Sequence, residues 1–186
     1  MTAENYIFSF PLALSPSEDL SLYCSVHNGV GNPNALYRQL QASEPTLGLL
    51  NATKILSLNQ LIAAANLAAT RKVRIPSAWE VVYNVAPSTH LGHVLRDFSF
   101  SESTTESSAD VIVVWISTTG EDRAYEDLLE SLNIPKVTQA INAYLSRQAV
   151  ADKDQFVLIY KLTKQEVLTS SLEAAVLTRI ATKMLA

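Results

Sequence analysis

Runs of apolar residues separated by turn-forming residues predict several short strands. Residues 6–14 and 20–26 are rich in Tyr, Phe, Leu and Val, and a Ser-Pro-Ser-Glu-Asp segment separates them as a turn would. Residues 110–117, DVIVVWIS, form a continuous β-branched run, which indicates a strand buried on both faces. Shorter apolar runs lie at 46–52 and 80–85, and we expect strands there as well.

Other segments carry helix start signals. Asn32 and Pro33 suit the N-cap and first position of one helix, and Ser57 precedes a long helical stretch, LNQLIAAANLAATRK. A further helix is expected from about Thr89. After Gly120 almost the whole chain is helical in pattern, over residues 121–132, 135–148, 152–160 and 164–184. We therefore expect a single α+β (mixed α/β) domain, in which a small mixed β-sheet packs with several helices and the C-terminal third is helical.

Two of the expected helices are apolar on more than one side. The helix that begins at Leu58 has one apolar face and a second, opposite group formed by Ala63, Ala64 and Leu67. The closing helix has two stripes: Leu168, Leu172, Val176 and Ile180, and Ala174, Leu177, Ala181 and Met184. A helix that is apolar all round is buried all round, so each second stripe either packs under another element or meets a partner.

We expect these two helices to lie side by side and to supply the contacts to a protein partner. The pattern leaves open which stripe faces outward. The candidate partner-binding residues are Ala63, Ala64, Leu67, Leu172, Val176, Leu177, Ile180 and Met184.

Composition restricts the class of protein. The formal net charge of -4 argues against a protein that coats nucleic acid non-specifically. Cys24 is the one cysteine, which excludes an intrachain disulfide and a zinc site built on several thiolates, and indicates a reducing compartment. The most apolar helical stretch, residues 61–69, is too short to span a membrane, and the N-terminus lacks a basic leader. We expect an intracellular protein without a membrane contact.

Patterns for catalysis or metal binding are weak. One helix face is expected to carry two imidazoles and a carboxylate, from His90, His93 and Asp97. The apolar residues lie on another side of that helix and should face the core, so we expect the histidine face to be solvated. The 27–34 segment, HNGVGNPN, resembles a Gly-rich loop that opens a helix, without the Gly-Lys-Ser/Thr ending of a P-loop. Cys24 is expected to be a core or half-buried thiol. A small α/β enzyme or ligand-binding domain that uses the 27–34 loop or the histidine face remains the alternative; no cofactor or metal is otherwise expected.

A basic cluster, RKVR at residues 71–74, follows the long helix. Lysine and arginine in a last helical turn are ordinary partners of the helix dipole. Arg71, Lys72 and Arg74 also form a candidate phosphate-binding site for RNA, because they concentrate positive charge on an acidic protein.

An ordered set of motifs resembles a known family. The stretch EVVYNVAPSTHLGHVLRDF at 80–98 is similar to the signature of the smallest core subunit of the KEOPS (EKC) complex, the PRPK-binding protein (TPRKB) family with its fungal and archaeal relatives. Asn59-Gln60-Leu61 with Ala64 and Ala65, Ile159-Tyr160-Lys161-Leu162, and Leu172–Val176 with Arg179, Thr182 and Lys183 resemble further family motifs. The chain departs from the family at Phe98, which is followed by serine in place of glycine, and at Arg74 and Pro76.

The resemblance implies a subunit that is not an enzyme. Members of this family bind and stimulate the small atypical kinase (PRPK-like) subunit of KEOPS, and through it they join the catalytic sugar-kinase-like subunit. The complex makes threonylcarbamoyl-adenosine (t6A) in tRNA, and the family helps to hold the tRNA by its 3′ end. A nuclear and cytoplasmic location, and in eukaryotes roles in telomere maintenance and transcription, would follow from the same resemblance.

Overall fold

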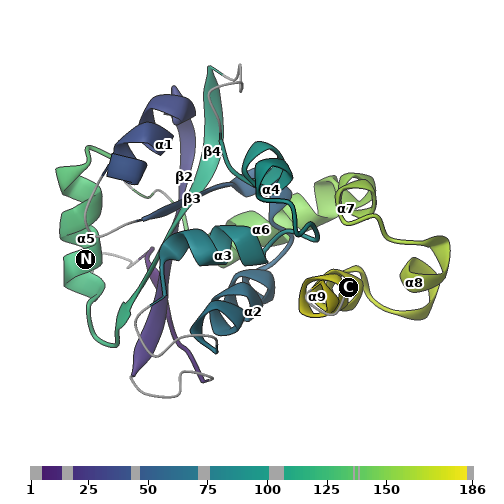
Figure 1. The fold of residues 1–186 in the computed structure, drawn as a ribbon. Coiled ribbons are helices and arrows are strands. Elements are labelled where there is room, and N and C mark those ends of the chain that lie inside the picture. Colours follow the sequence, from purple (N-terminus) through teal and green to yellow (C-terminus); the bar gives the residue numbers. More distant parts are fainter. Residues whose placement is uncertain are drawn as a thin grey trace.

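The computed structural model of the chain describes residues 6–13, 19–42, 47–70, 76–100, 107–135, 137 and 139–183. In these residues a four-stranded sheet carries helices on both faces (Figure 1). The strands are β1 (Phe8–Pro11), β2 (Leu20–Gly31), β3 (Gly48–Asn51) and β4 (Ser108–Thr118). The helices are α1 (Pro33–Ala42), the 3-10 helix η1 (Ala52–Lys54), α2 (Leu58–Ala69), α3 (Ala78–Asn84), α4 (Leu91–Phe98), α5 (Asp122–Ser131), α6 (Ile141–Ala151), α7 (Lys153–Ile159), α8 (Lys164–Thr169) and α9 (Leu172–Thr182).

The α+β class and the helical C-terminal third are confirmed. The strand order is β1-β2-β4-β3, and each of the three pairings is antiparallel, so the sheet is antiparallel where we expected a mixed one. The strand predicted at 110–117 is β4, which lies between β2 and β3. Its residues 111–116 are buried and alternate between the cores on the two faces of the sheet, as a strand covered on both sides requires.

The strand predicted at 80–85 is wrong, because helix α3 occupies these residues. Ser77 caps this helix by accepting a hydrogen bond from the backbone N–H of Trp79 at 3.3 Å. Val81, Val82 and Val85 are fully buried and, together with Ala78, repeat at helical spacing. The β-branched residues favoured a strand, but packing of this helical face against the core outweighs a propensity of less than about 1 kcal/mol per residue.

Helix boundaries in the second half also differ from the expected ones. Helix α4 begins at Leu91 with His90 as its N-cap, and α6 begins at Ile141, later than predicted. The expected helix over 164–184 is divided into α8 and α9, because Ser171 caps a new helix by accepting from the backbone N–H of Ala174. No helix in the described part of the chain is both long and apolar enough to traverse a bilayer.

The sheet separates two cores. One face packs against α1 and α5, and we call it the α1–α5 side. The opposite face packs against the remaining longer helices, including α2, α3, α6, α7 and α9, and we call it the α2–α9 side. The core of the α2–α9 side is the larger of the two and is rich in alanine and valine. Small side chains allow its helices to approach one another and the sheet closely.

Candidate functional site

Helices α2 and α9 lie side by side on the α2–α9 side, as expected (Figure 1). Their N-terminal ends meet where the side-chain amide of Asn59 donates a hydrogen bond to a carboxylate oxygen of Glu173 at 3.1 Å. Each helix starts at a serine cap, Ser57 for α2 and Ser171 for α9. The two helices therefore begin at the same end of the molecule and form one surface.

The structure divides the candidate partner-binding residues into two groups. Ala64, Val176 and Ile180 are fully buried in the core of the chain itself, so a partner cannot reach their side chains in this fold. Ala63, Leu67, Leu172 and Leu177 are partly exposed. We call these four residues the α2–α9 surface; Met184, the remaining candidate, lies outside the described residues.

The C-terminal end of α9 is held on the body of the protein by Lys183, the C-cap residue. Its buried side chain donates hydrogen bonds to the carbonyl oxygens of Tyr83 and Ala86, where α3 ends. The ammonium group also lies over the ring of Tyr83, 3.7 Å from its centroid. These contacts hold the two ends of the α2–α9 surface in a defined position.

A buried polar network holds the start of α2. Gln60 accepts a hydrogen bond from the backbone N–H of Leu56 at 2.9 Å and donates to the carbonyl of Val85 at 3.1 Å and to the hydroxyl of Tyr160. Burial raises the pKa of Tyr160, so this phenol stays protonated at physiological pH. Since the three partners of Gln60 come from separate segments, the network joins α2 to the ends of α3 and α7.

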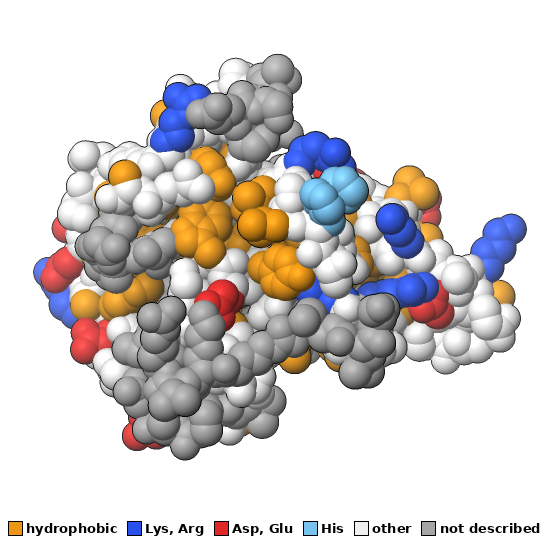
Figure 2. All heavy atoms as spheres, viewed as in Figure 1, with side chains coloured by type: hydrophobic (Ala, Val, Ile, Leu, Met, Phe, Trp, Pro, Cys, Tyr) orange, Lys and Arg blue, Asp and Glu red, His pale blue; other side chains and the backbone are white. Residues whose placement is uncertain are grey.

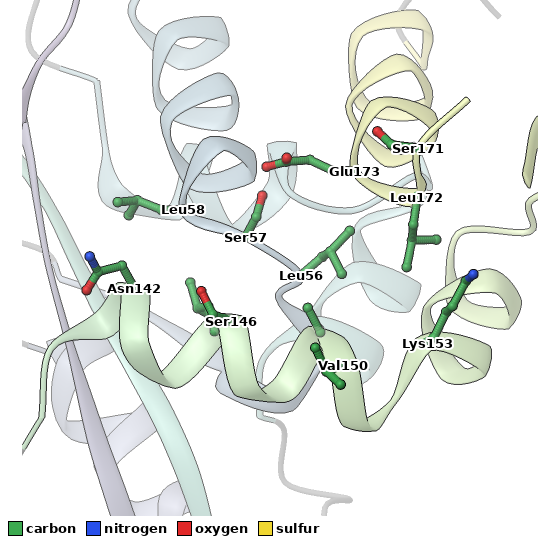
Figure 3. Close-up of a pocket in the computed structure, with 12 residues that line it drawn as sticks. Leu56, Ser57, Leu58, Asn142, Ser146, Val150, Lys153, Ser171, Leu172 and Glu173 are labelled. Atoms are coloured by element: carbon green, nitrogen blue, oxygen red, sulfur yellow. The ribbon is translucent and has the colours of Figure 1, made fainter. Parts of the chain in front are cut away.

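An apolar groove of about 670 Å³ opens beside the start of α2. Figure 3 shows α6 along one wall, with the first residues of α2 and α9 opposite it. Leu56 and Leu172 point toward the space between these elements, and Val150 of α6 also lines the groove. Val150 is 85% exposed, which is unusual for a large aliphatic side chain. Leu172 belongs both to the groove and to the α2–α9 surface, so the two adjoin at the start of α9.

Comparison with protein families identifies the chain. The family described as "kinase binding protein CGI-121" matches residues 27–184, which is most of the sequence. The chain belongs to the CGI-121 family. No curated protein matches it. The resemblance to the KEOPS small-subunit family is thereby confirmed, and as a family member the chain is a kinase-binding protein.

This CGI-121 protein has a second groove, of about 850 Å³, which we call the basic groove. It is bounded by η1, α4 and the ends of α7 and α9. The charged residues that line it are Lys54, Arg96, Asp97, Lys161 and Lys183. None of the four cationic residues stood out as a ligand-binding residue in the sequence, because they are far apart along the chain. Arg96, Lys161 and Lys183 belong to family motifs, but no motif contains more than one of them.

The predicted histidine face is solvated, as expected. His90, His93 and Asp97 are exposed, and the two imidazole rings stack with their centroids 4.4 Å apart. Asp97 accepts two hydrogen bonds from the guanidinium of Arg96, at 2.7 and 3.1 Å. Among the described residues, no group of three His, Cys, Asp or Glu side chains is placed to hold a metal ion.

The 27–34 segment does not form a phosphate-binding loop. Residues up to Gly31 continue strand β2, and a bulge between His27 and Val30 shifts its register against β4. Gly29 adopts a φ of 60° in the bulge, and its N–H donates to Asp110. Asn32 caps α1 as predicted, by accepting a hydrogen bond from the N–H of Ala35 at 3.1 Å. The glycines therefore serve the bulge, which corrects the loop hypothesis.

Two further sequence predictions concern single sites. Cys24 is fully buried in the core of the α2–α9 side, and burial raises the pKa of its thiol, so it remains an unreactive thiol at neutral pH. Arg71, Lys72 and Arg74, the predicted RNA-binding residues, lie outside the described residues.

Proposed function

We propose that this CGI-121 protein is a non-catalytic subunit of a KEOPS (EKC) complex. In this role it binds and stimulates the small atypical PRPK-like kinase, and through that kinase it joins the catalytic sugar-kinase-like subunit. The family match supports the kinase partner. The observation that carries the proposal is the α2–α9 surface, where apolar side chains on two fixed helices remain partly in water.

The α2–α9 surface is suited to a protein partner by its chemistry. Leu67 and Leu177 are half-exposed on neighbouring helices, and Ala63 lies one turn before Leu67. Small residues between larger ones allow close approach by an element of another protein. Apolar side chains near the centre of an interface each contribute about 2 kcal/mol or more to binding. A kinase lobe that covers this surface would also reach the apolar groove through Leu172.

The test measures kinase binding by Leu177→Glu and Ala63→Glu variants. Each places a carboxylate on the α2–α9 surface, where docking would bury it unpaired, so affinity for the kinase should fall by at least ~30-fold. Leu128→Glu is the matched control, since Leu128 is also a half-exposed leucine but lies on α5, on the opposite side of the sheet. Its affinity should remain within ~3-fold of the native value.

Circular dichroism and thermal melting should show that all three variants stay folded, because the substituted side chains are partly in water. Native affinity of both α2–α9 variants would exclude this surface. Failure of the native protein to bind the kinase would refute the proposed function itself.

The proposed function includes help in recruiting tRNA for t6A modification, in the nucleus and the cytoplasm. The acidic chain as a whole does not attract RNA, so the contribution must come from local positive charge such as Arg71, Lys72 and Arg74. A patch of this size binds weakly alone and contributes mainly within the full complex. Roles in telomere maintenance and transcription would depend on the same complex.

Reversing the charge of Arg71, Lys72 and Arg74 to glutamate tests the tRNA contribution. We expect the assembled complex to lose tRNA affinity and to show a flatter salt dependence, by a log-log slope of about 2, if three phosphate contacts are lost. Kinase binding should not change, because none of the three substituted residues belongs to the α2–α9 surface. Unchanged tRNA affinity at low salt would leave the cluster as an ordinary helix end.

A further inference from the structure

The basic groove collects positive charge from four elements on an otherwise acidic protein. Lys54 comes from η1, Arg96 from α4, Lys161 from the turn after α7 and Lys183 from the end of α9. Figure 2 shows Lys and Arg side chains gathered beside the exposed histidine pair on this face of the molecule. Asp97 is the one carboxylate among the lining residues. The groove therefore has an excess of positive charge.

Two of these cations are available to a ligand. Arg96 is engaged by Asp97 through two hydrogen bonds, and Lys183 donates to backbone carbonyls of α3 and its C-terminal turn. Lys54 and Lys161 form no ion pair with any residue that the structure describes. Their ammonium groups keep all of their hydrogen-bond donors for a molecule that enters the groove.

The backbone at Lys161 gives an independent indication. Helix α7 ends in a Schellman motif, in which the N–H of Lys161 donates to the carbonyl of Leu158 and the N–H of Leu162 donates to that of Val157. This motif requires a left-handed residue, and Lys161 has a φ of 51°. Glycine and asparagine favour this conformation, and lysine is strained in it.

The other two non-glycine residues with positive φ in the described chain are both asparagines, Asn32 and Asn133. Helix α5 ends in the same motif as α7, with Asn133 at the corresponding position. Strained residues concentrate where function requires a particular side chain. Glycine or asparagine would suit the backbone at position 161 better than lysine does. Either residue would remove a positive charge from the groove.

The lining of the groove indicates which anion fits. A phosphate monoester carries nearly two negative charges at neutral pH and three acceptor oxygens, which matches two available ammonium groups beside a third, fixed one. The aromatic residues of the lining are Phe98 and His93. Phe98 is 3% exposed, and the imidazole of His93 is stacked on that of His90, with centroids 4.4 Å apart. A nucleobase would therefore find no Phe, Tyr or Trp ring in this groove on which to stack.

We propose that the basic groove binds a phosphate monoester. The group is carried either by a phosphoserine or phosphothreonine side chain of a protein or by a small phosphorylated molecule. Lys54 and Lys161 hold the phosphate oxygens, and Lys183 supplies a fixed positive charge at the wall of the groove.

The experiment titrates the native protein with three probes in an uncharged, low-salt buffer and follows binding by NMR chemical shifts. The probes are a blocked phosphoserine peptide, inorganic phosphate, and a short single-stranded RNA without terminal phosphates. The test variant is Lys54→Gln with Lys161→Asn, since asparagine accepts the left-handed backbone. Lys164→Gln removes one exposed charge outside the groove, from α8, and serves as the control.

We expect saturable binding of a phosphate probe, weakened at least ~10-fold in the double variant and unchanged in Lys164→Gln. Tighter binding of the peptide than of inorganic phosphate would assign the group to a protein side chain, and equal binding would assign it to a small molecule. The proposal is overturned if neither phosphate probe saturates at millimolar concentration, or if the double variant binds like the native protein. RNA that binds more tightly than both and depends on the same lysines would also overturn it.

Discussion

The two sides of the sheet differ in how completely the chain covers its own apolar surface. On the α1–α5 side the rings of Tyr23, Trp115 and Tyr125 pack on one another, with centroids 5.5 to 6.1 Å apart. The most exposed large apolar side chains in the described chain are instead on α4, α6, α7 and α8: Leu91, Val150, Leu158 and Leu168. The apolar groove and the basic groove are both formed by helices of the α2–α9 side.

Polar groups follow the same division. On the α1–α5 side, His27, Ser25 and Tyr125 form a buried chain of hydrogen bonds that ends on the carbonyls of Pro135 and Val113. On the α2–α9 side, lysine side chains line an open groove. The α2–α9 side also has a buried network, around Gln60, but in addition it presents apolar and charged side chains to solvent. This contrast supports the proposal that the partner binds on the α2–α9 side.

The largest expected effect distinguishes the inner from the outer stripe of α9. Ile180 is fully buried, whereas Leu177, one turn earlier, is partly exposed. Ile180→Glu should lower the free energy of unfolding by at least ~4 kcal/mol, because it places a carboxylate in an apolar core. Leu177→Glu should lower it by less than ~1 kcal/mol. Urea unfolding measures the free energy of unfolding of both variants. Equal decreases would contradict the structure, in which Ile180 is buried and Leu177 is partly exposed.

The sequence could not decide between these stripes. Val176 and Leu177 are both apolar, and which of them is buried depends on where other helices pack. The strand at 110–117 was predictable because its apolar run indicates burial on both faces without reference to any neighbour. The strand expected at 80–85 failed because three valines satisfy strand propensity and helical spacing at once. The basic groove could not be predicted, since its lysines meet only in the fold.

The α1–α5 side contains a buried histidine, His27, whose protonation should affect the stability of the protein. The carbonyl of Pro135 can only accept, so Nδ1 of His27 carries a proton and donates to it, while Nε2 lies 2.8 Å from the hydroxyl oxygen of Ser25. Burial lowers the pKa of His27, more strongly than the bond to Pro135 raises it. The folded chain thus binds this proton more weakly than the unfolded chain does. The free energy of unfolding should therefore keep its full value above a pH of about 6.5, the pKa of an unperturbed histidine. It should fall as the pH drops from there toward the lowered pKa of His27.

Urea unfolding between pH 7.5 and 5 measures that slope, and His27→Gln should flatten it. Two-dimensional NMR of the imidazole at neutral pH should show the Nδ1-protonated tautomer. The opposite tautomer, or a native slope in His27→Gln, would contradict the account of the α1–α5 side.

The smallest expected effect compares the ends of α5 and α7. Both are Schellman motifs, with Asn133 and Lys161 in the left-handed position. Lys161→Gly should raise the free energy of unfolding by ~0.5 kcal/mol, because relief of backbone strain exceeds the added entropy of the unfolded chain. Asn133→Lys should lower it by a similar amount. Thermal melting of the two variants checks the sign, and a loss of stability in Lys161→Gly would remove the argument from strain.

Hydrogen exchange of the protein with and without its kinase tests the central claim most directly. If the kinase docks on the α2–α9 surface, the backbone amides of α2 and α9 should exchange more slowly in the complex. Those of α1 and α5 should exchange at the same rate in both states, because the sheet lies between them and the partner. Protection confined to α1 and α5, with α2 and α9 unchanged, would contradict the assignment of kinase binding to this side of the sheet.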